Sequence, residues 1–205
     1  MNMFKYLTLC LIFITSTSSA FSKEIKNDWM GSYTLEASGE YEKAASLLVP
    51  YMGVGERSEF ATLRYAWLNY LQGNFNDAAR AYKKAMAQNP RSLDAKLGLT
   101  LPLMAQQRWR EAMRYIKQVL AQAPLNYTAH SRLLVCEEGL REWQELEKHA
   151  KNVAAFYPTD ANALVYLARS YAWQDKTLLA KSIYNKVLIR IPSHLEALQF
   201  IKNNP

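Results

Sequence analysis

Glycine and proline are both scarce in this sequence, with 7 of each among 205 residues. Loop-rich folds and β folds built from many tight turns depend on these two residues, so the sequence disfavours both. Half of the residues are hydrophobic and 21% are charged, which excludes a disordered chain. Alanine, leucine, lysine, arginine, glutamate and glutamine dominate the middle of the sequence. These are the stronger helix formers, and the composition therefore predicts an all-α protein.

Long apolar runs are also lacking, although the N-terminus carries a short one. Residues 6–15 are apolar, follow Lys5 and precede the small residues 18–20, an order typical of a secretory signal peptide. Crossing about 30 Å of hydrocarbon takes about 20 helical residues, so a retained membrane anchor is the weaker alternative. We expect residues 1–20 to be a signal peptide and residues 21–24 to be a short linker.

Cysteine occurs only at Cys10 and Cys136. Cleavage after Ala20 would remove Cys10, so the mature chain would fold without an intramolecular disulfide. We interpret Cys136 as a half-buried small apolar residue and not as a nucleophile. Since no later apolar stretch could span a membrane, we expect an exported protein without an integral span, periplasmic in a bacterium or else secreted. A peripheral association with the envelope stays open.

A spacing of 34 residues recurs along the chain. The prolines with this spacing are Pro90, Pro124, Pro158 and Pro192. A column of small residues keeps the same spacing at Ala44, Ala78, Ala112 and Ala180, with Leu146 in the fourth place. Three residues earlier, an aromatic column contains Tyr41, Phe75, Trp109 and Trp143. Self-similarity at a period of this length is the signature of a stacked helical repeat.

The fullest copy runs from Gly73 to Ala79, with Tyr82, Ala85 and Pro90 after it. This pattern resembles the tetratricopeptide-repeat family. The resemblance implies an all-α, right-handed α–α superhelix, a solenoid of five helical hairpins followed by a C-terminal capping helix. The register gives repeats at 25–58, 59–92, 93–126, 127–160 and 161–194, with the cap at 195–205. The cap is expected to bury an apolar face of Leu195, Leu198 and Ile201 and to expose Glu196 and Lys202.

The repeats also depart from the pattern. Gln107, Arg141 and Asp175 replace glycine in the column of the tight turn, so they must use a different turn or accept strain. Pro50 is expected inside the second helix of an irregular first repeat. Gly98 and Pro102 fall within one predicted helix, where a proline predicts a local bend.

Residues able to carry out chemistry are few. His130, His149 and His194 are scattered along the sequence with no partner at metal-ligand spacing. No phosphate-binding glycine loop, nucleophile elbow or zinc-protease helix is present. Glu137 and Glu138 are adjacent, and adjacent helical residues point about 100° apart, so a shared acid–base role is disfavoured. We therefore predict no catalytic residues, no cofactor and no metal, and a protein that is not an enzyme.

The formal charge is +7, which raises nucleic acid or an anionic surface as a partner. The lysines and arginines are, however, spread over successive helices among polar residues. We interpret them as solvated helix faces, and nucleic acid is disfavoured as a partner. The remaining candidate is a protein or peptide.

In proteins that this chain resembles, ligands lie against the first helices of the repeats. Helical periodicity places aromatic, aliphatic and arginine side chains on that inner surface. The candidate groove residues are Trp29, Tyr33, Phe60, Arg64, Trp67, Tyr70, Leu97, Leu101, Arg132, Val135, Tyr166, Arg169 and Trp173. Aromatic and arginine anchors dominate binding at protein interfaces. The three arginines could bind carboxylates through two hydrogen bonds each, which predicts a peptide with apolar anchors and some acidic character.

Two readings of this groove stay open. Trp67, Tyr70 and Trp173 could instead only pack between neighbouring first helices. Our functional hypothesis is an exported scaffold that binds a protein or peptide and assists an envelope assembly or secretion process. The alternative is an accessory subunit of an envelope enzyme or of a polysaccharide export system. A standalone enzyme is disfavoured because no catalytic set converges on one face.

Overall fold

The computed structural model describes residues 26–53, 55 and 57–204. The predicted signal peptide and linker lie outside these residues. Every regular element in the described part is a helix, which confirms the all-α prediction. None of the described helices combines the length and the apolar character that crossing a bilayer requires. The chain forms two compact units, one ending at Ser92 and the other beginning at Leu93, and each is described by itself.

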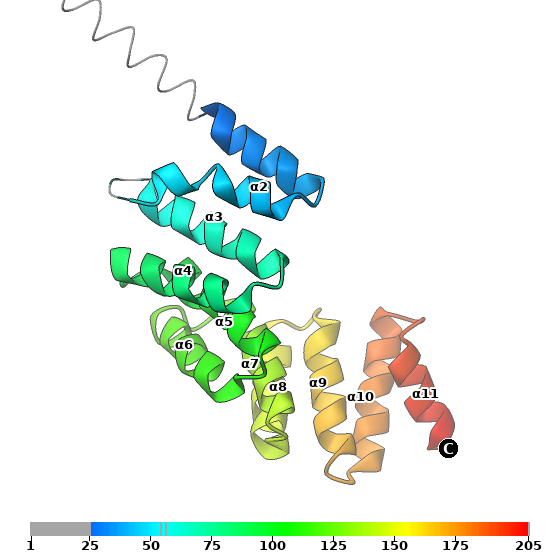
Figure 1. The fold of residues 1–205 in the computed structure, drawn as a ribbon. Helices are drawn as coiled ribbons and strands as arrows, with labels where there is room; N and C mark the ends of the chain where they lie inside the picture. Colours follow the sequence, from blue (N-terminus) through cyan, green and yellow to red (C-terminus); the bar gives the residue numbers. More distant parts are fainter. Residues whose placement is uncertain (1–25, 54, 56, 205) are drawn as a thin grey trace, which may run out of the picture. The chain divides into compact units, whose positions relative to one another are not determined.

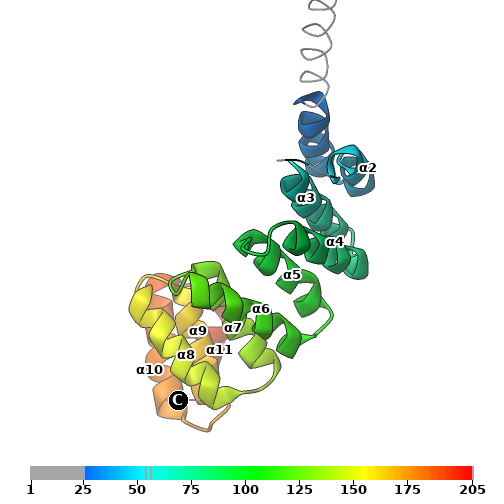
Figure 2. The same ribbon diagram turned by 90° about the vertical axis from the view of Figure 1, so that its left-hand side faces the viewer.

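The N-terminal unit begins with a helix over residues 26–37. It continues with α2 (Tyr41–Ser46), the 3-10 helix η1 (Val49–Tyr51), α3 (Ser58–Leu71) and α4 (Phe75–Gln88). Helices α3 and α4 pack side by side in Figures 1 and 2. Pro50 lies in η1 and not inside α2, which corrects the expectation for the first repeat. Proline lacks an N–H and disfavours the α conformation of the residue before it, so α2 stops after six residues.

Residues 93–204, the described part of the C-terminal unit, form seven helices. They are α5 (Leu93–Ala105), α6 (Trp109–Gln122), α7 (Tyr127–Gly139), α8 (Trp143–Phe156), α9 (Ala161–Ala172), α10 (Thr177–Arg190) and α11 (Leu195–Asn203). Consecutive helices pack on each other, and α7 also contacts both α5 and α9. The buried core of the unit includes Leu134, Leu146, Val153, Leu167 and Val187. Helix α5 runs through Pro102 without interruption, and both Pro102 and Gly98 are buried.

Proline ends the second helix of four successive hairpins. Helices α4, α6, α8 and α10 each stop two residues before a proline. The residue before the proline has φ between −138° and −125° in all four places. The proline ring clashes with an α-helical residue before it, so each helix ends just before its proline.

The turn inside each hairpin has the same hydrogen bonds at all five positions. At the third turn, Arg108 N–H donates to Leu103 O at 2.8 Å and Gln107 N–H donates to Met104 O at 2.9 Å. This is a Schellman motif, which needs a left-handed residue. That residue is Gly39 (φ 79°), Gly73 (81°), Gln107 (56°), Arg141 (58°) or Asp175 (57°). The three non-glycine residues therefore adopt the same left-handed turn conformation as the two glycines, which is strained for a residue with a Cβ atom.

Small and aromatic columns are packed as the repeat requires. The side chains of Ala44, Ala78, Ala112 and Ala180 are completely buried. Trp109 begins α6, and its ring lies directly against Gly139 at the end of α7. A Cβ atom added at Gly139 would lie 2.7–3.0 Å from three atoms of that ring. Contact of this kind leaves no room for a side chain at Gly139.

The buried face of α11 differs from the prediction. Ala197 is completely buried, and Phe200 and Ile201 pack on the core of the unit. Leu195 and Leu198 are instead 81% and 45% exposed. The same three- and four-residue spacing fits either face. The structure buries the face on which the Phe200 ring meets Tyr184, with ring centroids 4.8 Å apart, and Glu196 turns inward beside it.

Candidate peptide-binding surfaces

Several aromatic side chains form one partly exposed surface in the N-terminal unit. The Trp29 ring stacks on Phe60 at 5.2 Å and on Tyr51 at 5.9 Å between centroids. The Tyr51 hydroxyl donates a hydrogen bond to Asp28 Oδ2 at 2.5 Å, which fixes that ring. Phe60 is 53% exposed and Tyr33 is 49% exposed. We call Trp29, Tyr33 and Phe60 the aromatic face.

Arg64 lies beneath this face and is buried. Its Nη2 atom is 2.7 Å from Glu36 Oε2, and its Nε atom donates to Ser32 Oγ at 3.2 Å. The guanidinium lies 3.4 Å from the centroid of the Tyr33 ring. Trp67 donates from Nε1 to the other oxygen of Glu36 at 2.8 Å. Arg64 therefore holds neighbouring helices together and positions Tyr33, and it is not presented to a ligand.

Trp67 and Tyr70 continue the row of rings toward α4. Their centroids are 5.6 Å apart, and Tyr70 lies 5.8 Å from Phe75. Both side chains are half-buried. For these two residues the contacts support packing between helices more than exposure to a ligand.

Both arginines of the predicted groove in the C-terminal unit also have internal partners. Arg132 donates from Nη1 to the Leu97 carbonyl and to Thr100 Oγ1, the latter at 2.9 Å. Leu97 itself is buried. All three arginines thus have acceptors within the protein, and the expectation that they bind carboxylates of a ligand stays a prediction. Neighbouring helices supply acceptors at the spacing of the repeat, and binding a ligand instead would break bonds already made.

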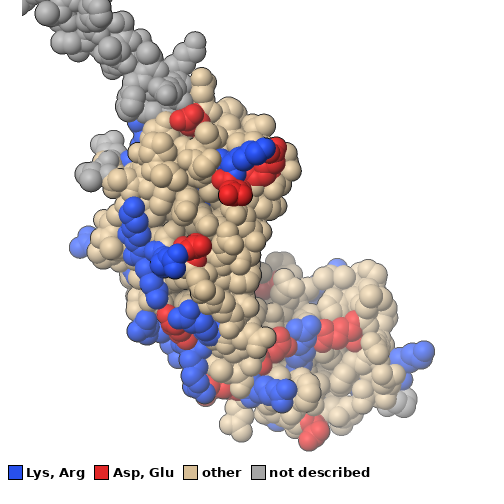
Figure 3. Space-filling model, viewed as in Figure 1, with Lys and Arg blue, Asp and Glu red and all other residues tan. Residues whose placement is uncertain are grey.

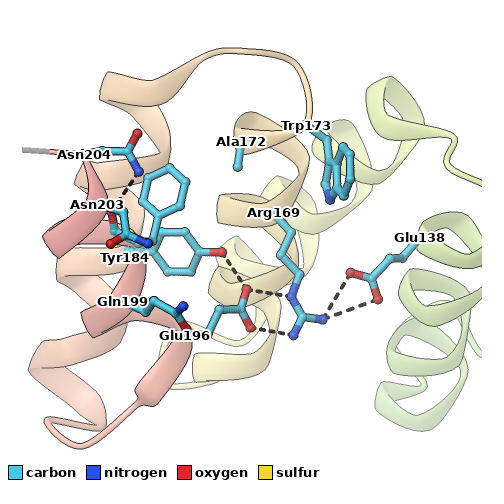
Figure 4. A pocket seen from close by; sticks show the side chains of 10 residues that line it. Glu138, Arg169, Ala172, Trp173, Tyr184, Glu196, Gln199, Asn203 and Asn204 are labelled. Carbon is cyan, nitrogen blue, oxygen red and sulfur yellow. Dashed lines mark hydrogen bonds and ion pairs between the residues drawn. The ribbon is translucent and has the colours of Figure 1, made fainter.

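Arg169 joins three helices through two carboxylates (Figure 4). Its Nε and Nη2 atoms donate to the two oxygens of Glu196 at 2.8 and 2.6 Å, and Nη1 donates to Glu138 Oε1 at 3.1 Å. The Tyr184 hydroxyl donates to Glu196 Oε1 at 2.6 Å. Burial alone would raise the pKa of Glu196, but the hydrogen bonds from Arg169 and Tyr184 lower it. The hydrogen bonds to Glu196 also raise the pKa of Arg169, so this group stays charged.

A cavity of about 360 Å³ opens beside this cluster, between α7, α9, α10 and α11. Its charged lining is Glu138, Arg169 and Glu196, and Trp173 and Phe200 line its apolar part. Figure 4 shows Trp173 bordering this space from the end of α9. The Trp173 ring stacks on Trp143 at 5.2 Å with an interplanar angle of 5°, yet the residue is 64% exposed. We call this cavity the α9–α11 pocket.

The other candidate groove residues are distributed around the first helices of the C-terminal unit. Tyr166 is half-buried, and its ring centroid lies 5.5 Å from the guanidinium of Arg169. Burial is the main cause of its raised pKa. Leu101 and Val135 are half-buried and do not line the α9–α11 pocket. Of the predicted residues in this unit, only Arg169 and Trp173 line it.

Sequence reasoning missed a buried cluster between α7 and α8. His130 Nδ1 lies 2.9 Å from His149 Nε2, and His149 Nδ1 lies 2.9 Å from Glu137 Oε2. His130 Nε2 donates to the Pro124 carbonyl at 2.8 Å. These histidines are therefore not scattered, which corrects the prediction. The signal was present in the seven-residue spacing of His130 and Glu137, which places both on one face of α7.

Glu137 belongs to this cluster through its contact with His149. Glu138 points instead to Arg169, so the adjacent carboxylates have different partners. Within the described residues, no group of three or more histidine, cysteine or acidic side chains is arranged to hold a metal ion.

Cys136 is completely buried, not half-buried as expected. Burial is the main cause that raises the pKa of its thiol to about 12. A thiol with such a pKa is not a nucleophile near neutral pH.

Charged side chains of opposite sign lie beside each other on the surface. Figure 3 shows basic and acidic groups adjoining on the visible face of both units. Ion pairs within single helices include Lys151 with Glu147, at 2.6 Å. Pairs of this kind support the interpretation of the basic residues as solvated helix faces.

Comparison with known proteins agrees with the helical repeat. Residues 70–135 and 162–193 match two models of the tetratricopeptide repeat. No curated protein matches the sequence. Among solved structures, MamA (41-end) from Desulfovibrio magneticus RS-1 is similar, with 16% identity, a TM-score of 0.74, and coverage of 84% of this chain and 97% of that one. A tetratricopeptide repeat protein from Parabacteroides merdae has 12% identity, a TM-score of 0.78, and coverage of 87% and 71%.

A third similar structure is YrrB, described as a TPR protein with an unusual peptide-binding site. It has 16% identity and a TM-score of 0.73, and the match covers 91% of this chain and 97% of YrrB. At these identities the similarity shows the fold alone. This fold is typical of scaffolds for protein–protein interaction, which are generally not enzymes. This chain therefore contains tetratricopeptide repeats and has the fold of a tetratricopeptide-repeat solenoid.

Proposed function

We propose that this protein is a non-enzymatic scaffold that binds a protein or peptide partner through the aromatic face of its N-terminal unit. The observation that carries the proposal is the exposure of Phe60 and Tyr33 on a surface whose rings are held in place. A large aromatic side chain that stays half in water is costly, and contact with a partner removes that cost. The neighbouring Met30 is 62% exposed and enlarges the apolar surface.

Neighbouring side chains hold two rings of the aromatic face in place. Trp29 supports Phe60 from one side, and Arg64 supports Tyr33 from below. Rigid aromatic anchors lose little conformational entropy on binding, so they favour affinity. Anchors of this type typically contribute about 1–2 kcal/mol or more each, equal to about a 5- to 30-fold change in Kd.

We further propose that the protein is exported and works in the bacterial envelope, in an assembly or secretion process. The N-terminal order of Lys5, apolar residues 6–15 and small residues 18–20 supports export. A reporter enzyme that is active only outside the cytoplasm, fused after residue 24, tests this. Reporter activity that is lost when Leu11→Arg interrupts the apolar run is expected. Equal activity for both fusions would contradict export through this segment.

The binding proposal is tested by affinity capture from the envelope of the native organism. Wild-type protein, Phe60→Ala and Phe156→Ala are used as bait. Phe156 is a matched control because it is a phenylalanine with 56% exposure on α8, in the other unit. We expect the captured partner to be lost with Phe60→Ala and kept with Phe156→Ala, while circular dichroism shows both variants folded. Capture that is equal for both variants would refute binding through the aromatic face.

A further inference from the structure

The side chains that line the α9–α11 pocket carry a net negative charge. Its ten lining residues include one cation, Arg169, and two carboxylates, Glu138 and Glu196. Arg169 makes two good bonds to Glu196, but its contacts to Glu138 are 3.1 and 3.4 Å long and come from one nitrogen atom. Glu138 is therefore the less fully neutralised carboxylate, and it lies at the wall of the cavity (Figure 4).

Helix ends add to this negative potential. Ala172 and Trp173 stand at the C-terminal end of α9, and Asn203 and Asn204 stand at the C-terminal end of α11. All four residues line the pocket. The C-terminal end of a helix carries a partial negative charge, so these two ends favour a cation in the cavity, whereas the N-terminal end of α11, where Glu196 lies, carries a partial positive charge.

The apolar part of the lining has the chemistry to receive a cation as well. Trp173 is 64% exposed, and its stacking on Trp143 holds the indole in a fixed orientation. The face of an indole attracts ammonium and guanidinium groups, more strongly than other aromatic rings do. Trp173 and Phe200 together can also contact the methylene groups of a long side chain.

We propose that the α9–α11 pocket binds a basic side chain, lysine or arginine, of a peptide or protein partner. The charged end lies between Glu138 and the exposed indole of Trp173, and the methylene groups contact the apolar wall. A volume of about 360 Å³ accommodates one such side chain but not a folded element. The inference rests on the proposed function only in taking the ligand to be a peptide. The ligand proposed for this pocket is basic, whereas the three groove arginines suggested a peptide with some acidic character.

Short capped peptides that differ at one position test the proposal. The central residue is lysine, arginine, alanine or glutamate, and acetyl and amide caps remove the terminal charges. Binding to the full mature chain and to each variant is measured by isothermal titration calorimetry, and the indole resonance of Trp173 in nuclear magnetic resonance titrations shows whether the peptide reaches this pocket. The chain has 5 tryptophans, so Trp173→Phe identifies that resonance.

We expect the lysine and arginine peptides to bind at least tenfold more tightly than the alanine and glutamate peptides. Added salt should weaken this difference, since the attraction is electrostatic and partly exposed. Glu138→Gln and Trp173→Ala should each reduce binding of the basic peptides at least fivefold. Glu145→Gln is the matched control, because Glu145 is an exposed carboxylate on α8 that does not line this pocket.

Three results would overturn the inference. They are equal binding of the four peptides, tighter binding of the glutamate peptide, and no response of Trp173 to any peptide. If Glu138→Gln unfolds the chain, Trp173→Ala and the salt titration still decide. None of these results would change the expected loss of partner capture by Phe60→Ala. The peptide titrations and the capture experiment can therefore refute the pocket proposal and the aromatic-face proposal separately.

Discussion

Replacing the three strained turn residues by glycine should stabilise this protein. Gln107, Arg141 and Asp175 adopt φ of 56°, 58° and 57° at exposed turns where two other copies have glycine. The left-handed conformation costs a residue with a Cβ atom about 1–2 kcal/mol, and glycine avoids that cost. Glycine loses about 0.4–1 kcal/mol more in conformational entropy on folding. The difference is a gain of about 0.5–1 kcal/mol for each site.

The gains should add, because the three turns belong to separate hairpins. The triple variant is therefore expected to gain about 2 kcal/mol, which raises Tm by about 4–8 °C in a chain of this size. Thermal unfolding followed by circular dichroism, together with denaturant titration, measures both quantities.

Two controls separate strain from a general effect of glycine. Gly73→Ala, at φ 81°, should destabilise by about 1 kcal/mol although an added Cβ there meets nothing within 4 Å. Lys117→Gly, at an exposed position inside α6, should destabilise by about 1 kcal/mol. If the three turn variants lose stability as Lys117→Gly does, the turns are not strained and the reasoning fails.

Three further predictions concern the C-terminal unit. Gly139→Ala should cost about 1–3 kcal/mol because its Cβ would overlap the Trp109 ring, and the cost should shrink in a Trp109→Leu background, as a double-mutant cycle measures. Cys136 should not react with a thiol reagent at pH 8 in the native protein and should react fully in denaturant, since burial holds its pKa at about 12; reaction at equal rates would show that the thiol is accessible. Burial alone would raise the pKa of Glu147, but hydrogen bonds from two lysines and a glutamine lower it from 4.5 to about 2. The contribution of Glu147 to the free energy of unfolding is therefore present above about pH 4.5 and lost as pH falls toward 2. Because both lysines are exposed, we expect this contribution to be about 1 kcal/mol. Unfolding free energies of wild type and Glu147→Gln should converge across that window, and a constant difference would contradict the assignment.

Local features of this protein follow from the sequence alone. Proline disfavours an α-helical conformation of the residue before it, and this effect does not depend on tertiary contacts. The positions of the prolines in the sequence therefore indicate the ends of α4, α6, α8 and α10. The 34-residue period predicted the helical hairpins because each copy repeats the same packing requirement. The small residues Ala44, Ala78, Ala112 and Ala180, which recur with this period, are all buried. The boundaries of the repeats stay a prediction.

Contacts between helices were decided only by the tertiary structure. Periodicity identifies the face on which Arg169 lies, but not that Glu138 and Glu196, which are 31 and 27 residues away in the chain, neutralise it. The face that α11 buries could not be chosen from spacing, because the apolar residues of α11 fit two faces equally well. His130 and His149 meet because α7 and α8 fold back on each other. The sequence thus determines which helices form and where they end, since those preferences are local. Which charges remain available to a partner depends on neighbours that only the packed chain brings together.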